Sequence, residues 1–366
     1  MVLDKIEIVN FKNIESATLE FPASVNCMLG NNGMGKSNLL EAIHFLCLAR
    51  PMRSIPELSL LRHGTELMSV HGNFTSDAGT SEEVSIGIVK GKGKTLRRNG
   101  KEYDRMSRHI GAFPLVSVTP RDSDIVTGSG EERRRLMDMV ISQADPAYLS
   151  QLVRYNRALE SRNRMLRAGV RDDILFESVE MQMNESSAAV HAARKEWTRM
   201  LAPEVTRYYS LIANSSEKAS IQYRSVLNDA SFNDIIAQSR PKDILLGYTS
   251  QGVHRDDLFT GLDSYSMRRL GSQGQVKTFT LALRLAIYDY LRSHGGMTPI
   301  LLLDDIFDKL DSQRVGKIME LVSRGDNFRQ IFITDTNREH LDEILSHLSG
   351  ERRLIGVKDG HFEVLR

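Results

Sequence analysis

The segment Gly30 to Ser37, GNNGMGKS, is the feature that most restricts how this chain can fold. The apolar run Val25 to Leu29 precedes it and a segment with helical spacing follows, so we expect a buried strand, a glycine-rich loop and a helix. In such a loop the glycines let backbone N–H groups surround phosphate oxygens, the lysine neutralises the β and γ phosphates, and the serine offers a hydroxyl to Mg²⁺. The predicted ATP-binding residues here are Gly30, Asn31, Asn32, Gly33, Met34, Gly35, Lys36, Ser37 and Asn38.

The acids that such a site needs for hydrolysis are expected at the end of another buried strand. Ile300 to Leu303 is such a run, and Asp304 and Asp305 follow it directly. Asp304 fits the carboxylate that holds Mg²⁺ together with Ser37, and Asp305 fits the group that polarises the attacking water. Taken alone, the pair more often marks only a polar strand end, but the phosphate loop changes that weighting. The predicted catalytic residues are therefore Lys36, Asp304 and Asp305.

A third motif, LGSQGQ at Leu270 to Gln275, opens a long helical segment. A serine between glycines at a helix start brings together a hydroxyl, backbone N–H groups and the positive end of the helix dipole, as an anion site requires. The alternative is an ordinary helix N-cap after a turn, which is the commoner case for the motif alone.

The pattern along the chain changes twice. Near the N-terminus, and again on both sides of Asn99-Gly100, short runs alternate between apolar and polar residues. This pattern predicts antiparallel strands, with Asn99-Gly100 as a two-residue hairpin turn. From Pro146 the pattern is helical, with one helix that stops at Gly169 and a second from Asp173 to Ile212. After Gly247 the pattern returns to α/β. We expect an ATPase head made of residues 1–140 and 246–366, split by an inserted helical arm at 141–245.

The composition excludes few functions, but it indicates where the protein acts. Lys plus Arg number 48 and Asp plus Glu 47, so any nucleic-acid binding must come from a local patch. Two cysteines, Cys27 and Cys47, do not suggest a disulfide framework, and no long uninterrupted apolar segment occurs. We expect a soluble cytoplasmic protein with no membrane association.

In order, the motifs resemble the ATPase heads of the SMC and ABC class, and more closely the RecF family of bacterial recombination mediators. The match covers nearly the whole chain, although the arm matches mainly in position. The motifs that carry it are NFKNI, GNNGMGKSNLLEAI, GSGEERRRLMD, HRDDL, GSQGQVK and LLLDDIFDKLD.

The resemblance implies a fold, site roles and partners. The fold is an α/β P-loop ATPase head with a mixed sheet and an inserted α-helical arm, and Lys12 and Asn13 lie beside the nucleotide. In an ATP-dependent homodimer, a signature of Ser272, Gly274 and Gln275 meets ATP bound to the other copy, and Asp311 lies in the loop that crosses the interface. The dimer binds double-stranded DNA at gaps, associates with the nucleoid, and helps to load RecA with RecR and RecO.

Some positions depart from the wider ATPase class. Asp305 stands where SMC and ABC heads usually carry Glu, as RecF proteins have it, so we expect slow ATP hydrolysis. The predicted activity is that of a weak, DNA-stimulated ATPase. Asp335 stands where a switch histidine is common, so no histidine is assigned. No Gln occupies the usual position after the first lobe, where Asp122 or Asp124 are the alternatives.

Basic residues gather in one predicted hairpin and on the first arm helix, where Arg162 is one of five arginines. A basic hairpin can neutralise DNA phosphates without reading bases, although charge runs are usually only solvated faces. The predicted DNA-binding residues are Lys92, Lys94, Arg97, Arg98 and Lys101.

Two further charged motifs have simple structural interpretations. In EERRRLMD, Arg134 and Asp138 are four residues apart, which favours an ion pair on a solvated helix face. In HRDDL, His254 and its charged neighbours are interpreted as a buried polar network.

Three functions remain open from sequence. The first is an ATP-gated DNA-binding protein of recombinational repair. The second is an ABC-type ATPase subunit with a different partner, which the helical insertion and the missing Gln and His disfavour. The third is an ATP-stabilised DNA scaffold without significant turnover, which Asp304 and Asp305 oppose only weakly.

Overall fold

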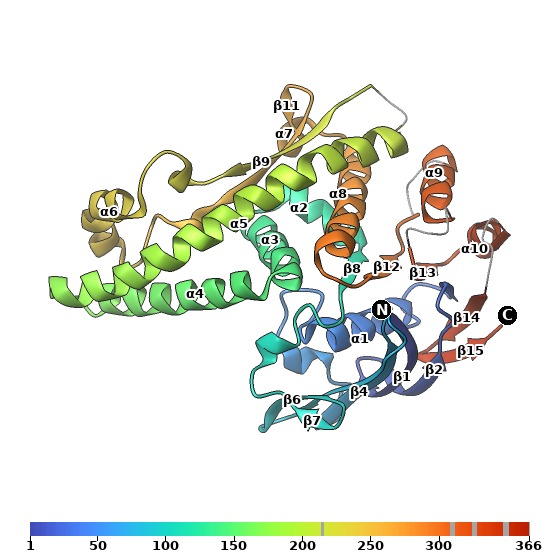
Figure 1. The fold of residues 1–366 in the computed structure, drawn as a ribbon. Coiled ribbons are helices and arrows are strands. Elements are labelled where there is room, and N and C mark those ends of the chain that lie inside the picture. The colour runs from blue at the N-terminus through green and yellow to red at the C-terminus, as the bar shows by residue number, and fades with distance from the viewer. Residues whose placement is uncertain (214–215, 308–311, 324–327, 347–350, 366) are drawn as a thin grey trace. The chain divides into compact units, whose positions relative to one another are not determined.

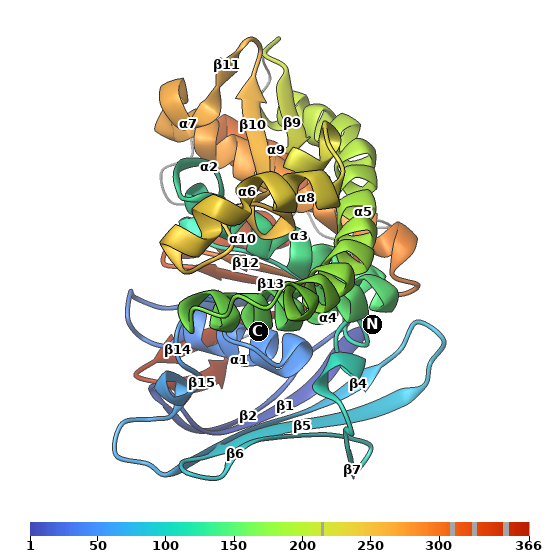
Figure 2. The same ribbon diagram turned by 90° about the vertical axis from the view of Figure 1, so that its left-hand side faces the viewer.

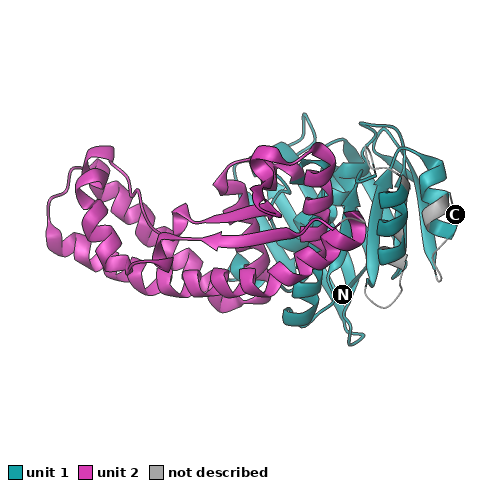
Figure 3. Cartoon of the chain, turned by 90° about the horizontal axis from the view of Figure 1, so that it is seen from above, with its two compact units in different colours: residues 1–122, 287–366 teal, residues 123–286 magenta. Residues whose placement is uncertain are grey.

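A computed structural model describes the chain except residues 214–215, 308–311, 324–327, 347–350 and 366 (Figure 1). It divides into two compact units (Figure 3): unit 1 is Met1–Asp122 with Ile287–Arg366, and unit 2 is Ser123–Ala286. The predicted arm lies within unit 2, and its boundaries at 141 and 245 remain a prediction. No helix in the described part of the chain is both long enough and apolar enough to cross a membrane.

The first sheet of unit 1 is antiparallel, in the order β2-β1-β4-β5-β6-β7 (Figure 2). Burial alternates along β4 and β5, because one face of the sheet is covered and the other is wet. Asn99 and Gly100 both have positive φ, 50° and 75°, which confirms the predicted hairpin turn. The strands are β1 Val2–Phe11, β2 Ile14–Glu20, β4 Leu67–Thr75, β5 Ser81–Val89, β6 Gly93–Arg98 and β7 Lys101–Glu102.

The second sheet of unit 1 has the order β15-β14-β3-β13-β12-β8 and is parallel except for β15. Its central strands are continuous apolar runs, as expected for strands covered on both faces. Because β3, β13 and β12 are parallel neighbours, their carboxyl ends meet at one edge, where ligands bind in such sheets. The strands are β3 Val25–Leu29, β8 Leu115–Val118, β12 Ile300–Asp304, β13 Gln330–Asp335, β14 Arg352–Lys358 and β15 His361–Val364.

Helix α1, Lys36–Leu48, contacts strands of both sheets and is buried over nearly its whole length. This explains why its apolar residues are not confined to one stripe, and why Glu41 and His44 are buried with them. Two further α-helices lie wholly within unit 1, α9 Ser312–Ser323 and α10 Arg338–Ser346.

Unit 2 contains the two predicted long helices, α4 Pro146–Arg167 and α5 Asp173–Ala213, which pack against each other. Gly169 has a φ of 67° and follows the end of α4, as predicted. One part of the predicted helical arm is a strand, because β9 pairs with β10, more than thirty residues later, in the sheet β11-β10-β9. The remaining elements are α2 Ser123–Thr127, α3 Gly130–Ala144, β9 Ala219–Arg224, α6 Phe232–Leu246, β10 Asp257–Leu262, β11 Tyr265–Ser266, α7 Met267–Leu270 and α8 Gln273–His294, which continues into unit 1.

The predicted ion pair between Arg134 and Asp138 is wrong. Asp138 instead accepts a 2.8 Å hydrogen bond from Nη2 of Arg194, a buried arginine of α5, and Arg134 Nη1 donates to the backbone carbonyl of Asp256 at 2.8 Å. A buried guanidinium has the stronger need for a carboxylate, because it cannot turn to water.

The buried network predicted for HRDDL is confirmed in part: Asp256 is buried and His254 is half-buried, whereas Arg255 is exposed. His254 Nδ1 lies 2.7 Å from the Tyr155 hydroxyl, and Nε2 lies 3.0 Å from the carbonyl of Thr249. Burial lowers the pKa of His254 to about 4, so the ring is neutral near pH 7.

Candidate nucleotide site

The phosphate loop joins β3 to α1, as predicted, and its glycines are there for geometric reasons. A Cβ on Gly30 would lie 2.3 Å from the Val357 carbonyl oxygen, and Gly35 has a φ of 116°. Nothing lies within 4 Å of a Cβ on Gly33, but its φ of 83° is a conformation that favours glycine. The N-cap of α1, Gly35, provides no side-chain hydrogen bond. The first backbone N–H groups of α1 are therefore not capped by a side chain, which fits a triphosphate bound in this loop.

Lys36 and Ser37 are the charged and polar side chains of this loop. Lys36 Nζ donates to the carbonyl oxygens of Gly30 at 2.6 Å and Asn31 at 3.1 Å. Burial lowers the pKa of Lys36, and the nearby carboxylates of Asp305 and Asp304 oppose that shift. An anion beside the ammonium group would favour its charged form in the same way.

Ser37 and Asp304, which are 267 residues apart in the chain, meet directly: Ser37 Oγ donates to Asp304 Oδ1 at 2.8 Å. Burial raises the pKa of Asp304, while hydrogen bonds from Ser37 and Thr334 favour its ionised form. A hydroxyl beside a carboxylate is the donor set that Mg²⁺ takes next to nucleotide phosphates. The two residues fit the predicted metal ligands, and the bound ion would draw charge from the phosphate oxygens.

Thr334 is a residue of this site that the sequence analysis missed. It is fully buried in β13, between the strands that carry the loop and the acids. Its Oγ1 donates to Asp304 Oδ1 at 2.8 Å and accepts from the backbone N–H of Asp305 at 2.9 Å. Asp305 has a φ of 48°, an uncommon conformation outside glycine. Thr334 therefore holds both acids, and only the strand order reveals it.

We expect Thr334→Val to lower the turnover of ATP while changing its affinity little. The two side chains have the same shape, so the change removes only the hydroxyl that positions Asp304 and Asp305, at a cost of about 1–3 kcal/mol per buried group left unpaired. Steady-state kinetics check it, with kcat falling and KM unchanged. Thr334→Ser keeps the hydroxyl and is expected to retain turnover. A loss of stability with unchanged kcat in the folded Val variant would contradict a positioning role.

Lys12 and Asn13 form the turn between β1 and β2, and their side chains contact the phosphate loop and α1. Asn13 accepts from Asn38 Nδ2 at 2.7 Å and donates to the Met34 carbonyl at 3.3 Å. The Lys12 ammonium forms an ion pair with Glu41 of α1. Their predicted contact with nucleotide remains a prediction.

The hairpin between β14 and β15 supports the loop from another side. The N–H of Gly360 donates to the Met34 carbonyl at 2.8 Å, and a Cβ on Gly360 would lie 2.4 Å from the carbonyl oxygen of Asn13. Asp359 and Gly360 both have positive φ, 50° and 79°. The Asp-Gly pair signals such a turn in the sequence, but nothing local indicates that the turn reaches the phosphate loop.

Asp335, at the position without the usual histidine, ends β13 at the same sheet edge. Its Oδ1 accepts from the Asn337 backbone N–H at 2.9 Å, and its Oδ2 lies 3.2 Å from His340 Nδ1. A histidine thus contacts this carboxylate from α10, five residues later in the chain. Asp122, one proposed substitute for the missing Gln, accepts from Thr119 within its own turn.

The signature residues belong to unit 2 and form a reciprocal cap at the start of α8. Gln275 N donates to Ser272 Oγ at 3.2 Å, and Ser272 N donates to Gln275 Oε1 at 2.9 Å. The N-cap interpretation is therefore confirmed for this state. Ser272 is also exposed, so another molecule has access to its hydroxyl. Asp311, predicted for the interface loop, lies outside the described residues.

The predicted DNA-binding hairpin divides into two kinds of residue. Lys94 Nζ donates to the Ala49 carbonyl at 2.7 Å and pairs with Glu57, and Arg98 forms two hydrogen bonds to Glu82, at 2.6 and 2.9 Å. Lys92, Arg97 and Lys101 are exposed. Lys94 and Arg98 thus already have carboxylate partners, which charge counting along the chain did not show.

Arg162, one of the basic residues of the first arm helix, does not face solvent. It is fully buried and pairs with Asp243 at 2.7 Å and Glu180 at 2.9 Å. It holds α4, α5 and α6 together rather than offering charge to a ligand.

A phosphate loop after one parallel strand, an acidic pair after another and a helix that starts on a glycine-flanked serine define a P-loop ATPase head of the SMC and ABC class. A sequence profile described as the RecF/RecN/SMC N terminal domain matches residues 2–359. The chain belongs to the RecF family. The predicted family and fold class are thereby confirmed.

Related proteins support membership of the RecF family over nearly the full length of the chain. A protein from Porphyromonas gingivalis named DNA replication and repair protein RecF is 46% identical over 98% of this chain and 99% of its own. A protein of the same name from Phocaeicola vulgatus is 44% identical, over 98% and 97%.

Solved structures agree with the fold. A structure of the recombination mediator protein RecF with ATP, from the RecFOR pathway, has a TM-score of 0.89 and 29% identity, and covers 100% of this chain and 98% of that one. The Smc head domain of Pyrococcus furiosus, at 16% identity and a TM-score of 0.59, shares the fold.

Proposed function

We propose that this protein is an ATP-dependent DNA-binding recombination mediator of gap repair. ATP and Mg²⁺ bind at the loop and the Ser37–Asp304 pair, and two copies join so that Ser272, Gly274 and Gln275 of each complete the site of the other. The dimer holds duplex DNA near single-stranded gaps. Weak, DNA-stimulated hydrolysis releases it, with Asp305 polarising the attacking water.

The observation that carries this proposal is the 2.8 Å contact between Ser37 and Asp304, which brings together beside the phosphate loop the two side chains that would hold Mg²⁺. The names of the relatives support the DNA repair role, and the RecFOR title of the ATP-bound neighbour supports joint action with RecR and RecO. We also propose that the protein helps to load RecA and that it acts in the cytoplasm, at the nucleoid.

Molar mass in solution with ATP and Mg²⁺ tests the composite site. Wild type is expected to become a dimer with ATP. Ser272→Arg is expected to bind ATP but stay monomeric, because a long cation fills the exposed signature face, whereas Lys36→Met loses ATP binding itself. Ser293→Arg, at the other end of α8 and also exposed, is the matched control and should dimerise like wild type. Wild type that stays monomeric at saturating ATP, with or without duplex DNA, would sink the proposal.

A further inference from the structure

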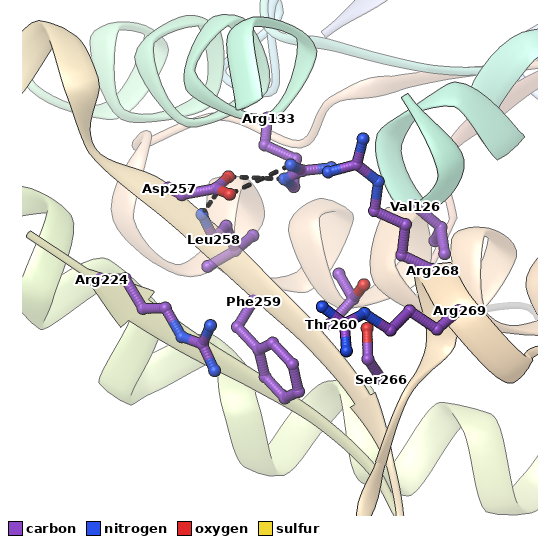
Figure 4. A pocket seen from close by; sticks show the side chains of 10 residues that line it. All are labelled: Val126, Arg133, Arg224, Asp257, Leu258, Phe259, Thr260, Ser266, Arg268 and Arg269. Carbon is purple, nitrogen blue, oxygen red and sulfur yellow. Dashed lines mark hydrogen bonds and ion pairs between the residues drawn. The ribbon is translucent and has the colours of Figure 1, made fainter. Parts of the chain in front are cut away.

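Unit 2 contains a pocket of about 380 Å³ that none of the predicted sites includes. Figure 4 shows its lining, with β10 as the floor and side chains from α3, α7 and the end of β9 around it. The lining residues are Val126, Arg133, Arg224, Asp257, Leu258, Phe259, Thr260, Ser266, Arg268 and Arg269.

The charge of this pocket is strongly positive. Asp257 is the one acid among the lining residues, and the Arg133 guanidinium neutralises it by donating hydrogen bonds of 2.6 and 3.1 Å to its carboxylate. Arg224, Arg268 and Arg269 are exposed and have no carboxylate within ion-pair distance among the residues that the structure describes. Four arginines and one aspartate leave a formal charge of +3 around one hollow.

The groups that face the pocket suit phosphate. A guanidinium offers its donors as a planar fork that matches phosphate oxygens, and the hydroxyls of Thr260 and Ser266 add neutral donors. The Arg224 guanidinium lies 4.1 Å from the centre of the Phe259 ring. It therefore covers one face of the only aromatic ring in the lining, which leaves less room for a stacked base and favours contacts to the sugar-phosphate backbone.

We propose that the pocket defined by Arg224, Arg268 and Arg269 binds phosphate groups of the DNA backbone. This assignment rests on the proposed function, because DNA is the polyanion that such a protein meets. It moves the expected DNA contact away from the basic hairpin of unit 1, where two of the five predicted residues already have carboxylate partners. The contact is independent of base sequence and sensitive to salt.

The experiment measures affinity for a short blunt duplex, with ATP and Mg²⁺ present, between 50 and 200 mM salt. Arg268→Ala/Arg269→Ala is expected to weaken binding and to make the slope of log K against log salt shallower by about two, one for each lost phosphate contact. Arg268→Lys/Arg269→Lys keeps the charge and is expected to keep the slope.

The matched control is Arg199→Ala/Arg207→Ala, which removes two exposed arginines of α5 in the same unit, each paired with a glutamate three residues earlier. Its slope should equal that of wild type. An unchanged slope in Arg268→Ala/Arg269→Ala, or an equally shallower slope in the control, would show that the pocket does not bind DNA phosphates. The proposed function would be unaffected.

Two further outcomes separate other causes. If poly-glutamate competes for wild type but not for Arg268→Ala/Arg269→Ala, while the duplex slope is unchanged, the pocket takes an acidic protein segment and the DNA assignment is wrong. If wild type forms ATP-dependent dimers but does not bind duplex at 50 mM salt, the DNA part of the proposed function is wrong, and so is the assignment of the pocket to DNA.

Discussion

Asp304→Asn is expected to lower ATP turnover by about 10²- to 10³-fold, since a metal ligand that helps to stabilise transition-state charge contributes several kcal/mol and each 1.4 kcal/mol is tenfold in rate. The asparagine keeps the shape of the buried carboxyl and can still accept from Ser37 or Thr334, so the local fold is retained. The negative charge that would hold Mg²⁺ is lost. Phosphate release under single-turnover conditions measures the effect.

A second readout for this variant does not depend on hydrolysis. Mg²⁺ is expected to strengthen binding of a fluorescent ATP analogue to wild type more than to Asp304→Asn, because the variant lacks the carboxylate that holds the ion. Asp104→Asn, whose side chain is 82% exposed, is the control and should match wild type in both assays. Turnover of Asp304→Asn within tenfold of wild type, with an unchanged effect of Mg²⁺, would remove Asp304 from the metal site.

Arg194→Met is expected to lower the free energy of unfolding of unit 2 by about 3–5 kcal/mol, because removing one partner of a buried ion pair leaves charges without compensation. The Arg194 guanidinium reaches Asp256 Oδ2 and the Val253 carbonyl at 2.7 Å each, and Asp138 at 2.8 Å. Burial alone would lower the pKa of Arg194, but the charges of Asp138, Tyr148 and Asp256 raise it well above its ordinary value.

Urea denaturation checks this with a local probe. Trp197 is the one tryptophan of the chain and lies buried on α5, three residues after Arg194, so its fluorescence reports unit 2. Arg199→Met, 71% exposed on the same helix, is the control and should stay within about 0.5 kcal/mol of wild type. A double variant with Asp256→Asn should lose less than the sum of the single changes, since each leaves the other partner unpaired. Equal midpoints for Arg194→Met and wild type would show that the network adds nothing to stability.

The sequence predicted those parts of the fold whose signal is local. The phosphate loop, the strand before Asp304, the helices α4 and α5 and the Asn99-Gly100 turn all follow from a few consecutive residues, through periodicity or turn chemistry. The strand β9 was missed because its partner β10 lies beyond an intervening helix, and a short strand is stabilised by that partner. The arm segment therefore contains part of a sheet where a helix was expected.

The candidate site divides in the same way. Ser37 and Asp304 were predicted as partners because each ends or follows a strand in a recognisable motif. Thr334 and Gly360 were not, because their roles arise only when β13 lies between β3 and β12 and when the last hairpin reaches the loop.

By itself, the sequence determined which segments are strands and helices around the phosphate loop, and which side chains carry the chemistry of ATP. Only the tertiary structure decided which charges are available. Lys94, Arg98 and Arg162 are neutralised by carboxylates from distant segments, whereas Arg224, Arg268 and Arg269 line a pocket whose one acid is already paired. The physical reason is range: backbone preferences act over a few residues, but the free energy of a charge depends on every group that folding brings within a few ångströms of it.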